Sequence, residues 1–269
     1  RLEGPVVADV ADHFRLRWPR ELQAPAPSAP LDGPDVQLAR TVPERVYSGL
    51  PKGEFTILES YLRALKSAER LIYLENQFLW SSEVVSLLAA KLREPPRDDF
   101  RLVVLLPARP NTGGDDTRGQ IGVLVDADKK SGGETSRFLA CTLYQPGRGG
   151  GLVYVHAKIG IVDDRWLTIG SANLNEHSLF NDSEVNVVLH DEELARATRL
   201  RLWREHLERD DVDGDPATVI DELWRPTAEE ELERRKRDGY SERRLVLLPH
   251  VSRRAEALRG PLSGLLVDG

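Results

Sequence analysis

Residues 153–189 read VYVHAKIGIVDDRWLTIGSANLNEHSLFNDSEVNVVL, and this stretch carries the pattern that decides the fold. From residue 153 to residue 161 every second side chain is apolar, which predicts a half-buried β-strand. His156 and Lys158 then point to the same side of that strand. An imidazole and an ammonium side by side lose hydration and repel each other when the histidine is protonated, so the pair predicts an anion bound between them.

A hairpin follows and ends in polar groups. Residues 163–165 predict a tight turn, and residues 166–169 predict the returning strand. Gly170 then permits a close backbone approach, while Ser171 and Asn173 offer neutral hydrogen-bond donors. Lysine, serine and asparagine around a histidine predict a phosphate-binding pocket.

Glu184 begins the next apolar run, at residues 185–189, which predicts a further strand. Its carboxylate is well placed to accept a proton from the second ring nitrogen of His156. Such a partner would fix the tautomer of the imidazole and raise its basicity.

The spacing of these residues resembles the signature of the phospholipase D superfamily. The signature runs His156-x-Lys158-x-x-x-x-Asp163 and continues, after six residues, with Gly170-Ser171-x-Asn173. For Asp163 two interpretations stay open, a residue of the catalytic signature that supports the architecture and a simple turn residue.

The resemblance also implies roles for the site residues. It implies that His156 is the general acid and base, that Lys158 and Asn173 hold the phosphoryl oxygens, that Ser171 assists and that Glu184 orients His156. Family members place two such motifs face to face, so the nucleophilic histidine, which forms the phosphohistidine, would come from a missing N-terminal half or from a second subunit. No cofactor and no metal are expected.

A second segment carries candidate substrate-binding residues. Residues 71–80, LIYLENQFLW, predict a buried strand that Glu75, Asn76 and Gln77 interrupt with polar side chains, which need partners. The segment is similar to a motif that precedes the second catalytic signature in eukaryotic-type phospholipases D. Arg118 lies in the segment after a predicted strand, where the loops of α/β sheets often line binding sites, so it is a further candidate for substrate binding. The alternative is that this loop caps the following helix.

Composition restricts the function classes. The chain has 269 residues, a net charge of −7, 40% hydrophobic residues and 30% charged residues, which is typical of a soluble globular protein. The negative charge argues against a broad nucleic-acid surface. One cysteine, Cys141, excludes an intrachain disulfide, and we expect it to pack in a strand at residues 138–143.

The alternation of helical and strand patterns predicts an α/β fold, a mixed β-sheet sandwiched between helices as in a phospholipase D-like half domain. Helices are expected at 5–18, 54–70, 82–92, 119–128 and 191–207, and strands at 35–42, 71–80 and 100–106. The expected units are 1–18, the end of a truncated first catalytic half; 19–53, a linker with one strand; 54–210, the catalytic domain; and 211–269, a helical extension. The absence of methionine suggests a fragment.

Three functions compete on the sequence. The first is a phospholipase D that hydrolyses or transphosphatidylates phospholipids at a membrane surface, without nucleic acid as a partner. The second is a cardiolipin synthase-like phosphatidyltransferase, which differs mainly in the acceptor, and the third is a non-catalytic interaction half domain. The compartment is not set by any signal; a soluble or peripheral membrane protein of the cytoplasm is the expectation.

Overall fold

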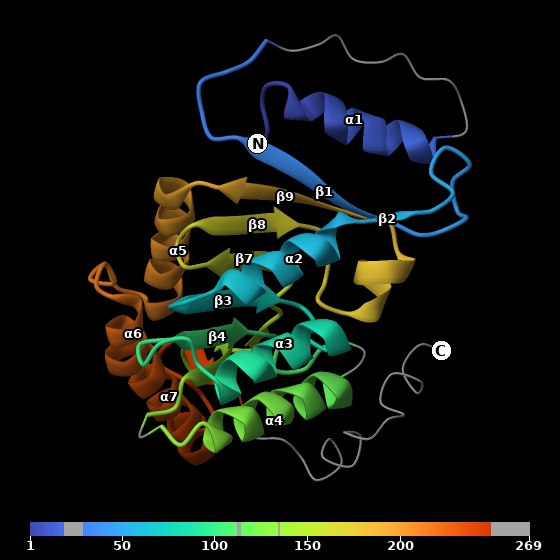
Figure 1. Ribbon diagram of the computed structural model, residues 1–269. Helices are drawn as coiled ribbons and strands as arrows, with labels where there is room; N and C mark the ends of the chain where they lie inside the picture. Colours follow the sequence, from blue (N-terminus) through green and yellow to red (C-terminus); the bar gives the residue numbers. More distant parts are fainter. Residues whose placement is uncertain (19–28, 112–113, 134, 249–269) are drawn as a thin grey trace.

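A mixed β-sheet forms the centre of the protein in the computed structural model, which describes residues 1–18, 29–111, 114–133 and 135–248 (Figure 1). Residues 19–28, the first part of the predicted linker 19–53, and residues 249–269, the end of the predicted extension, lie outside the described residues. In the described part the sheet has ten strands, in the order β10-β5-β4-β3-β7-β8-β9-β1-β2, and β6 pairs with β5. Strands β3, β4 and β5 are parallel, and all other pairs are antiparallel.

The strand bounds follow the apolar runs of the sequence. They are β1 (Val36–Val42), β2 (Glu54–Phe55), β3 (Leu71–Asn76), β4 (Arg101–Leu105), β5 (Phe138–Tyr144), β6 (Leu152–Val153), β7 (Lys158–Val162), β8 (Trp166–Gly170), β9 (Glu184–His190) and β10 (Leu245–Leu247). Strands β3, β4 and β5 are covered on both faces, which explains why they read as continuous apolar runs.

Helices cover both faces of the sheet (Figure 1). On one face lie α2 (Thr56–Ser67), α3 (Ser82–Arg93) and α4 (Gly114–Lys130), and on the other α5 (Glu192–Leu207), α6 (Pro216–Val219), the π-helical turn η2 (Ile220–Trp224) and α7 (Arg225–Asp238). Each face has its own apolar core. The predicted α/β architecture is therefore confirmed, and Cys141 is fully buried in the second core as expected.

Two further elements lie near the ends of this sandwich. Helix α1 (Val6–Arg17) packs beside β1 at the edge of the sheet, and a short π-helical turn, η1 (His177–Asn181), connects β8 to β9. In the part of the chain that the structure describes, no helix has the length and apolarity needed to cross a bilayer.

The strand predicted at residues 153–161 is wrong in its extent. β6 pairs with β5, whereas β7 starts at Lys158 and pairs with β3. The chain must therefore pass from the β5 side of the sheet to the far side of β3, and residues 154–157 form no ladder on the way. The predicted alternation survives nevertheless, because Val155 and Ile161 are both buried in the core beneath α5.

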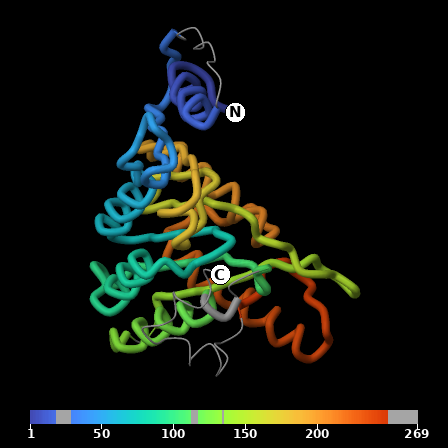
Figure 2. Tube along the Cα trace, turned by 90° about the vertical axis from the view of Figure 1, so that its right-hand side faces the viewer, coloured from blue at the N-terminus to red at the C-terminus, as the bar shows by residue number. Residues whose placement is uncertain are grey.

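Strand directions bring the polar signature residues to one end of the sheet. The antiparallel register pairs Asn76, at the end of β3, with Lys158, at the start of β7, and Gly170, at the end of β8, with Asn186 near the start of β9. Figure 2 shows the molecule from this end, which is the right-hand side of Figure 1. Residues from β3 and from the later strands β7, β8 and β9 therefore meet at a single end of the sheet.

Candidate active site

Lys158 is a buried ammonium at this end of the sheet. Only 7% of the residue is exposed, and Nζ donates to Gln77 Oε1 and to the backbone oxygen of His156, each at 3.0 Å. Burial lowers the pKa of Lys158, and the negative charge of Glu184 opposes that shift. An ammonium has three protons, and two of them are used in these bonds. The third has no acceptor among the described residues.

Asn173 lies beside Lys158 and shares its acceptor. Asn173 Nδ2 donates to Gln77 Oε1 at 3.4 Å, so a single amide oxygen receives both donors. Asn173 Oδ1 is buried and has no partner among the described residues. The two donors that the sequence assigned to phosphate are thus together in the fold.

His156 is exposed, in the extended segment just before β7. Its ring lies 6.1 Å from the ring of Tyr154, measured between centroids, and neither ring nitrogen bonds to any residue that the structure describes. The imidazole is therefore open to a substrate, next to the buried ammonium of Lys158.

The expected hydrogen bond from His156 to Glu184 is not formed, and the prediction needs correction. The Glu184 carboxylate accepts from the hydroxyl of Ser171 through one oxygen and from Ser178 Oγ, at 2.7 Å, through the other. Its oxygens are therefore occupied by hydroxyl donors, and its effect on the site is electrostatic, through the charge of Lys158.

Gly170 is required where β8 meets β9. A Cβ at this position would lie 2.1 Å from Asn186 Oδ1 and 2.4 Å from the backbone oxygen of Val185, so no other residue fits. The buried Asn186 accepts from the Ala172 amide at 3.2 Å and donates to Thr168 Oγ1 at 3.2 Å. This contact fixes the start of the loop that carries Ser171 and Asn173.

Asp163 lies at the other end of β7, away from His156. Its carboxylate accepts from the backbone amides of Glu69, Arg70 and Leu71, at 2.7, 2.8 and 2.7 Å. It also begins the hairpin turn with φ of 52°, and the following Asp164 has φ of 53°, the positive values that tight hairpins favour. The sequence left two interpretations of Asp163 open, a signature residue that supports the architecture and a simple turn residue. The geometry favours the first, because Asp163 joins the hairpin turn to the start of β3.

Replacing Asp163 by alanine should therefore destabilise the protein without changing the pocket. Three amides would lose a charged acceptor, which costs about 1–3 kcal/mol because two of the bonds are solvent-exposed. Thermal unfolding measures this loss, and the affinity of the folded variant for inorganic phosphate serves as control. A variant with unchanged melting temperature and weakened phosphate binding would place Asp163 in the site instead.

Glu75 does not face the site, contrary to the expected substrate-binding role. It is 4% exposed and points to the α5 side of the sheet, where it accepts from the Tyr73 hydroxyl at 2.5 Å and lies 3.0 Å from His206 Nε2. Because successive strand residues face opposite sides, Glu75 and Asn76 cannot both face the substrate.

Asn76 and Arg118, the other expected substrate residues, make structural bonds. Asn76 is 1% exposed, and its Oδ1 accepts from the backbone amides of Phe78 and Leu174 at 3.2 Å each, which ties the loop after β8 to the end of β3. Arg118 donates to the backbone oxygen of Ala108 at 3.1 Å. Of the four expected substrate residues, only Gln77 has a side chain that hydrogen-bonds to the side chains of Lys158 and Asn173 among the described residues.

Two residues of the site were missed in the sequence. Tyr154 donates to Asn111 Oδ1 at 2.7 Å and accepts from Gln77 Nε2 at 2.8 Å. The period-two pattern already placed Tyr154 on the face of His156 and Lys158, which is a usable signal. Asn111 lies in the loop after β4, and no local pattern distinguishes it.

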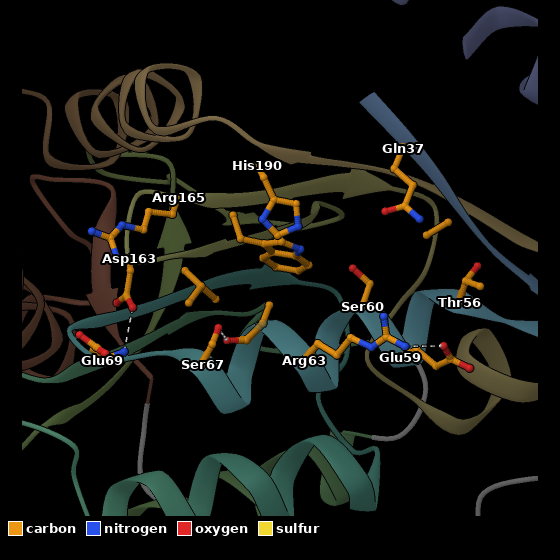
Figure 3. A pocket seen from close by; sticks show the side chains of 14 residues that line it. Gln37, Thr56, Glu59, Ser60, Arg63, Ser67, Glu69, Asp163, Arg165 and His190 are labelled. Carbon is orange, nitrogen blue, oxygen red and sulfur yellow. Dashed lines mark hydrogen bonds and ion pairs between the residues drawn. The ribbon is translucent and has the colours of Figure 1, made fainter. Parts of the chain in front are cut away.

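A separate hollow of about 600 Å³ lies between α2 and strands β8, β9 and β1 (Figure 3). Trp166 and His190 line it, and of the predicted site residues Asp163 alone does so. Its Arg63 forms an ion pair with Glu59. The hollow is therefore distinct from the cluster around Lys158. Within the residues that the structure describes, no group of three or more His, Cys, Asp or Glu side chains is placed to hold a metal ion.

Comparisons with known proteins bear on this arrangement. A family model described as "Cardiolipin synthase, PLD-like domain" matches residues 61–204. The chain is 28% identical to phospholipase D A of Dictyostelium discoideum over 77% of this chain and 20% of that protein. It is 31% identical to phospholipase D2 of Bos taurus over 52% of this chain and 19% of that protein. The chain thus spans about a fifth of the length of these relatives.

Solved structures also match. Nuc from Salmonella typhimurium, described as a phospholipase D family member, aligns with a TM-score of 0.46 and 17% identity over 66% of this chain and 96% of that chain. Phosphatidylserine synthase from Haemophilus influenzae aligns with a TM-score of 0.45 and 13% identity over 64% of this chain and 38% of that chain.

Proposed function

Because this chain belongs to the phospholipase D superfamily, we propose that it supplies one half-site of a phosphodiesterase that hydrolyses or transphosphatidylates phospholipids. The observation that carries the proposal is the convergence of Lys158 and Asn173 on one oxygen, 3.0 and 3.4 Å away, beside the exposed ring of His156. Transfer of a phosphoryl group requires this combination of a positive charge, neutral hydrogen-bond donors and a group that carries a proton.

Lys158 and Asn173 hold the non-bridging oxygens of the phosphodiester. The free proton of the ammonium and the free amide proton of Asn173 are the available donors, and burial makes the charge of Lys158 more effective than it would be in water. The donors are in place before the substrate arrives, so they stabilise the charge that develops on the phosphoryl oxygens without reorganising.

His156 carries the proton. Its exposed ring protonates the leaving alcohol oxygen and, in the second step, takes a proton from water or from an acceptor alcohol. Ser171, in the loop after β8, and Glu184, at the start of β9, support this arrangement. Their hydrogen bond holds the loop after β8, and the Glu184 carboxylate favours the charged form of Lys158.

A second histidine is needed to attack phosphorus, because one imidazole cannot attack and protonate at the same time. Of the other described histidines, His13 is buried on α1 and His206 is buried against Glu75, while His190 lies at the far end of β9 and His177 lies in η1. Following the two-motif arrangement that the resemblance implies, we assign the nucleophile to another half, supplied by a further segment or by a second copy of this chain.

The acceptor separates hydrolysis from transfer. The description of the matching family model, "Cardiolipin synthase, PLD-like domain", supports an alcohol as an alternative acceptor to water. Both reactions use the same residues, since His156 would deprotonate either acceptor. Product analysis in the presence of glycerol distinguishes them: a phosphatidylglycerol product reports transfer, and phosphatidic acid reports hydrolysis.

Substrate class is tested by direct competition. With the partner half present, phosphatidylcholine vesicles and single-stranded DNA are offered together in buffer with a chelator. Cleavage of the lipid is expected, because the net charge of −7 repels a polyanionic chain whereas a zwitterionic head group meets only the local charge of the site. The variant Lys158→Ala is the control for cleavage by contaminants. Preferential cleavage of DNA, or loss of the reaction in chelator, would contradict the proposal.

A further inference from the structure

Gln77 connects two groups of side chains that the proposed mechanism treats separately. Its Oε1 accepts from Lys158 and Asn173, and its Nε2 donates to the Tyr154 hydroxyl at 2.8 Å and to Asn111 Oδ1 at 3.3 Å. Gln77 is 6% exposed, and each end of its amide has two partners. The side chain is therefore held in one orientation from both ends.

The orientation of this amide follows from chemistry. An ammonium only donates, so the oxygen of Gln77 must face Lys158, and the nitrogen must then face Tyr154 and Asn111. The Tyr154 hydroxyl accepts from Gln77 and donates to Asn111 Oδ1 at 2.7 Å. Every bond in this assignment joins a donor to an acceptor, so the chain of bonds is internally consistent.

The bonds to Lys158 determine where its remaining proton points. Two of the three ammonium protons are taken by Gln77 Oε1 and by the backbone oxygen of His156. Because the three N–H bonds are tetrahedral about Nζ, fixing two of them fixes the third. Asn173 is constrained in the same way, since one amide proton goes to Gln77 and the other is left for a ligand.

We propose that Tyr154 is a positioning residue that acts through Gln77: it locks the Gln77 amide, and the amide oxygen aims the free donors of Lys158 and Asn173 at the phosphoryl group. The role assigned to these two donors rests on the proposed function. Tyr154 itself touches no reacting atom. Its hydroxyl is the part that acts, because without it the amide nitrogen keeps only the longer bond to Asn111 and the side chain can rotate.

The test measures Lys158 directly and needs no turnover. Lysines are labelled with ¹³C at Cε, the Lys158 signal is assigned by its loss in Lys158→Arg, and its pKa is followed by NMR. Inorganic phosphate is then titrated into the same samples. The variants are Tyr154→Phe, Gln77→Leu and the double variant, and Tyr240→Phe is the matched control, since it removes a hydroxyl from a tyrosine that contacts Arg148 instead.

Tyr154→Phe should lower the pKa of Lys158 further, because the charged form loses part of its acceptor, and should weaken phosphate binding about threefold to tenfold. The titratable residues near Lys158 are His156, whose backbone oxygen Lys158 contacts, and Glu184, from β9, and both are retained in these variants. Gln77→Leu should change both quantities in the same direction and by more. Tyr240→Phe should change neither.

The double variant decides whether Tyr154 acts through Gln77. If it does, Tyr154→Phe has no further effect once Gln77 is leucine, and additive effects would overturn the proposal. Unchanged Lys158 pKa in Tyr154→Phe would overturn it as well. Gln77→Ala replaces Gln77→Leu if the leucine variant does not fold. Failure of the wild-type chain to bind phosphate would refute the anion-binding role in the proposed function, while the pKa comparison would still decide the coupling.

Discussion

Replacing His156 by alanine should abolish cleavage of phosphodiesters with ordinary alcohol leaving groups and spare those with acidic leaving groups. The exposed ring beside Lys158 is the proton carrier of the proposed reaction. An alkoxide is too basic to leave without a proton, whereas p-nitrophenolate leaves unaided. The expected loss on the alkyl ester is about a hundredfold to ten-thousandfold, the usual contribution of general acid catalysis.

The measurement compares kcat/KM for a phosphatidylcholine and for a p-nitrophenyl phosphodiester, in a preparation that contains the second half. His190→Ala is the matched control, because His190 is also an exposed histidine but lies at the far end of the sheet, in the hollow of Figure 3. It should leave both rates unchanged. Equal losses on both substrates in His156→Ala would assign His156 a different step, such as attack on phosphorus.

The fold was predictable from the sequence because the spacing of apolar residues, every second residue in strands and every third or fourth in helices, follows which side chains are buried. Helix α3 and strands β1, β4 and β9 lie within one or two residues of their expected bounds. The predicted helix at 54–70 shows the limit of the method. Glu54 and Phe55 pair with Val42 and Thr41 of β1 as β2, so the helix starts at Thr56, and this ladder contact with an earlier strand has no local signal.

The sequence predicted which residues form the site better than it predicted the hydrogen bonds between them. Spacing placed His156, Lys158, Ser171 and Asn173 at one end of the sheet, because neighbouring antiparallel strands bring their opposite ends together. It could not reveal which partner each side chain takes. Glu184 was paired with His156 on reach alone, whereas Ser171 and Ser178, placed by the π-helical turn between β8 and β9, take both carboxylate oxygens.

Glu75 shows why a polar run in a strand resists interpretation from sequence. Adjacent polar residues of a strand face opposite sides, but the sequence does not say which side holds the site. Here Asn76 faces the side of Lys158, and Glu75 meets Tyr73 and His206 in the opposite core, where desolvation and the neighbouring carboxylate raise the pKa of Tyr73. His206 is far away in the sequence, so nothing local indicates that partner.

The chain on its own should turn over at least about a hundredfold more slowly than the chain with its second half, since the proposed mechanism takes the group that attacks phosphorus from that second half. The comparison uses one preparation of these 269 residues that is monomeric by light scattering and one to which the second half has been added. A second source of the missing histidine is another copy of the chain. In that case the rate per chain rises with chain concentration as dimers form.

Mixing experiments separate the two sources. Wild-type chain is diluted with His156→Ala chain at constant total concentration. If two copies build one site and each must supply His156, activity falls with the square of the wild-type fraction, because mixed dimers are inactive. If each chain works with a separate half, activity falls in direct proportion. Robust cleavage of phosphatidylcholine by the monomeric chain would contradict both arrangements, because the reaction would then need no histidine from a second half.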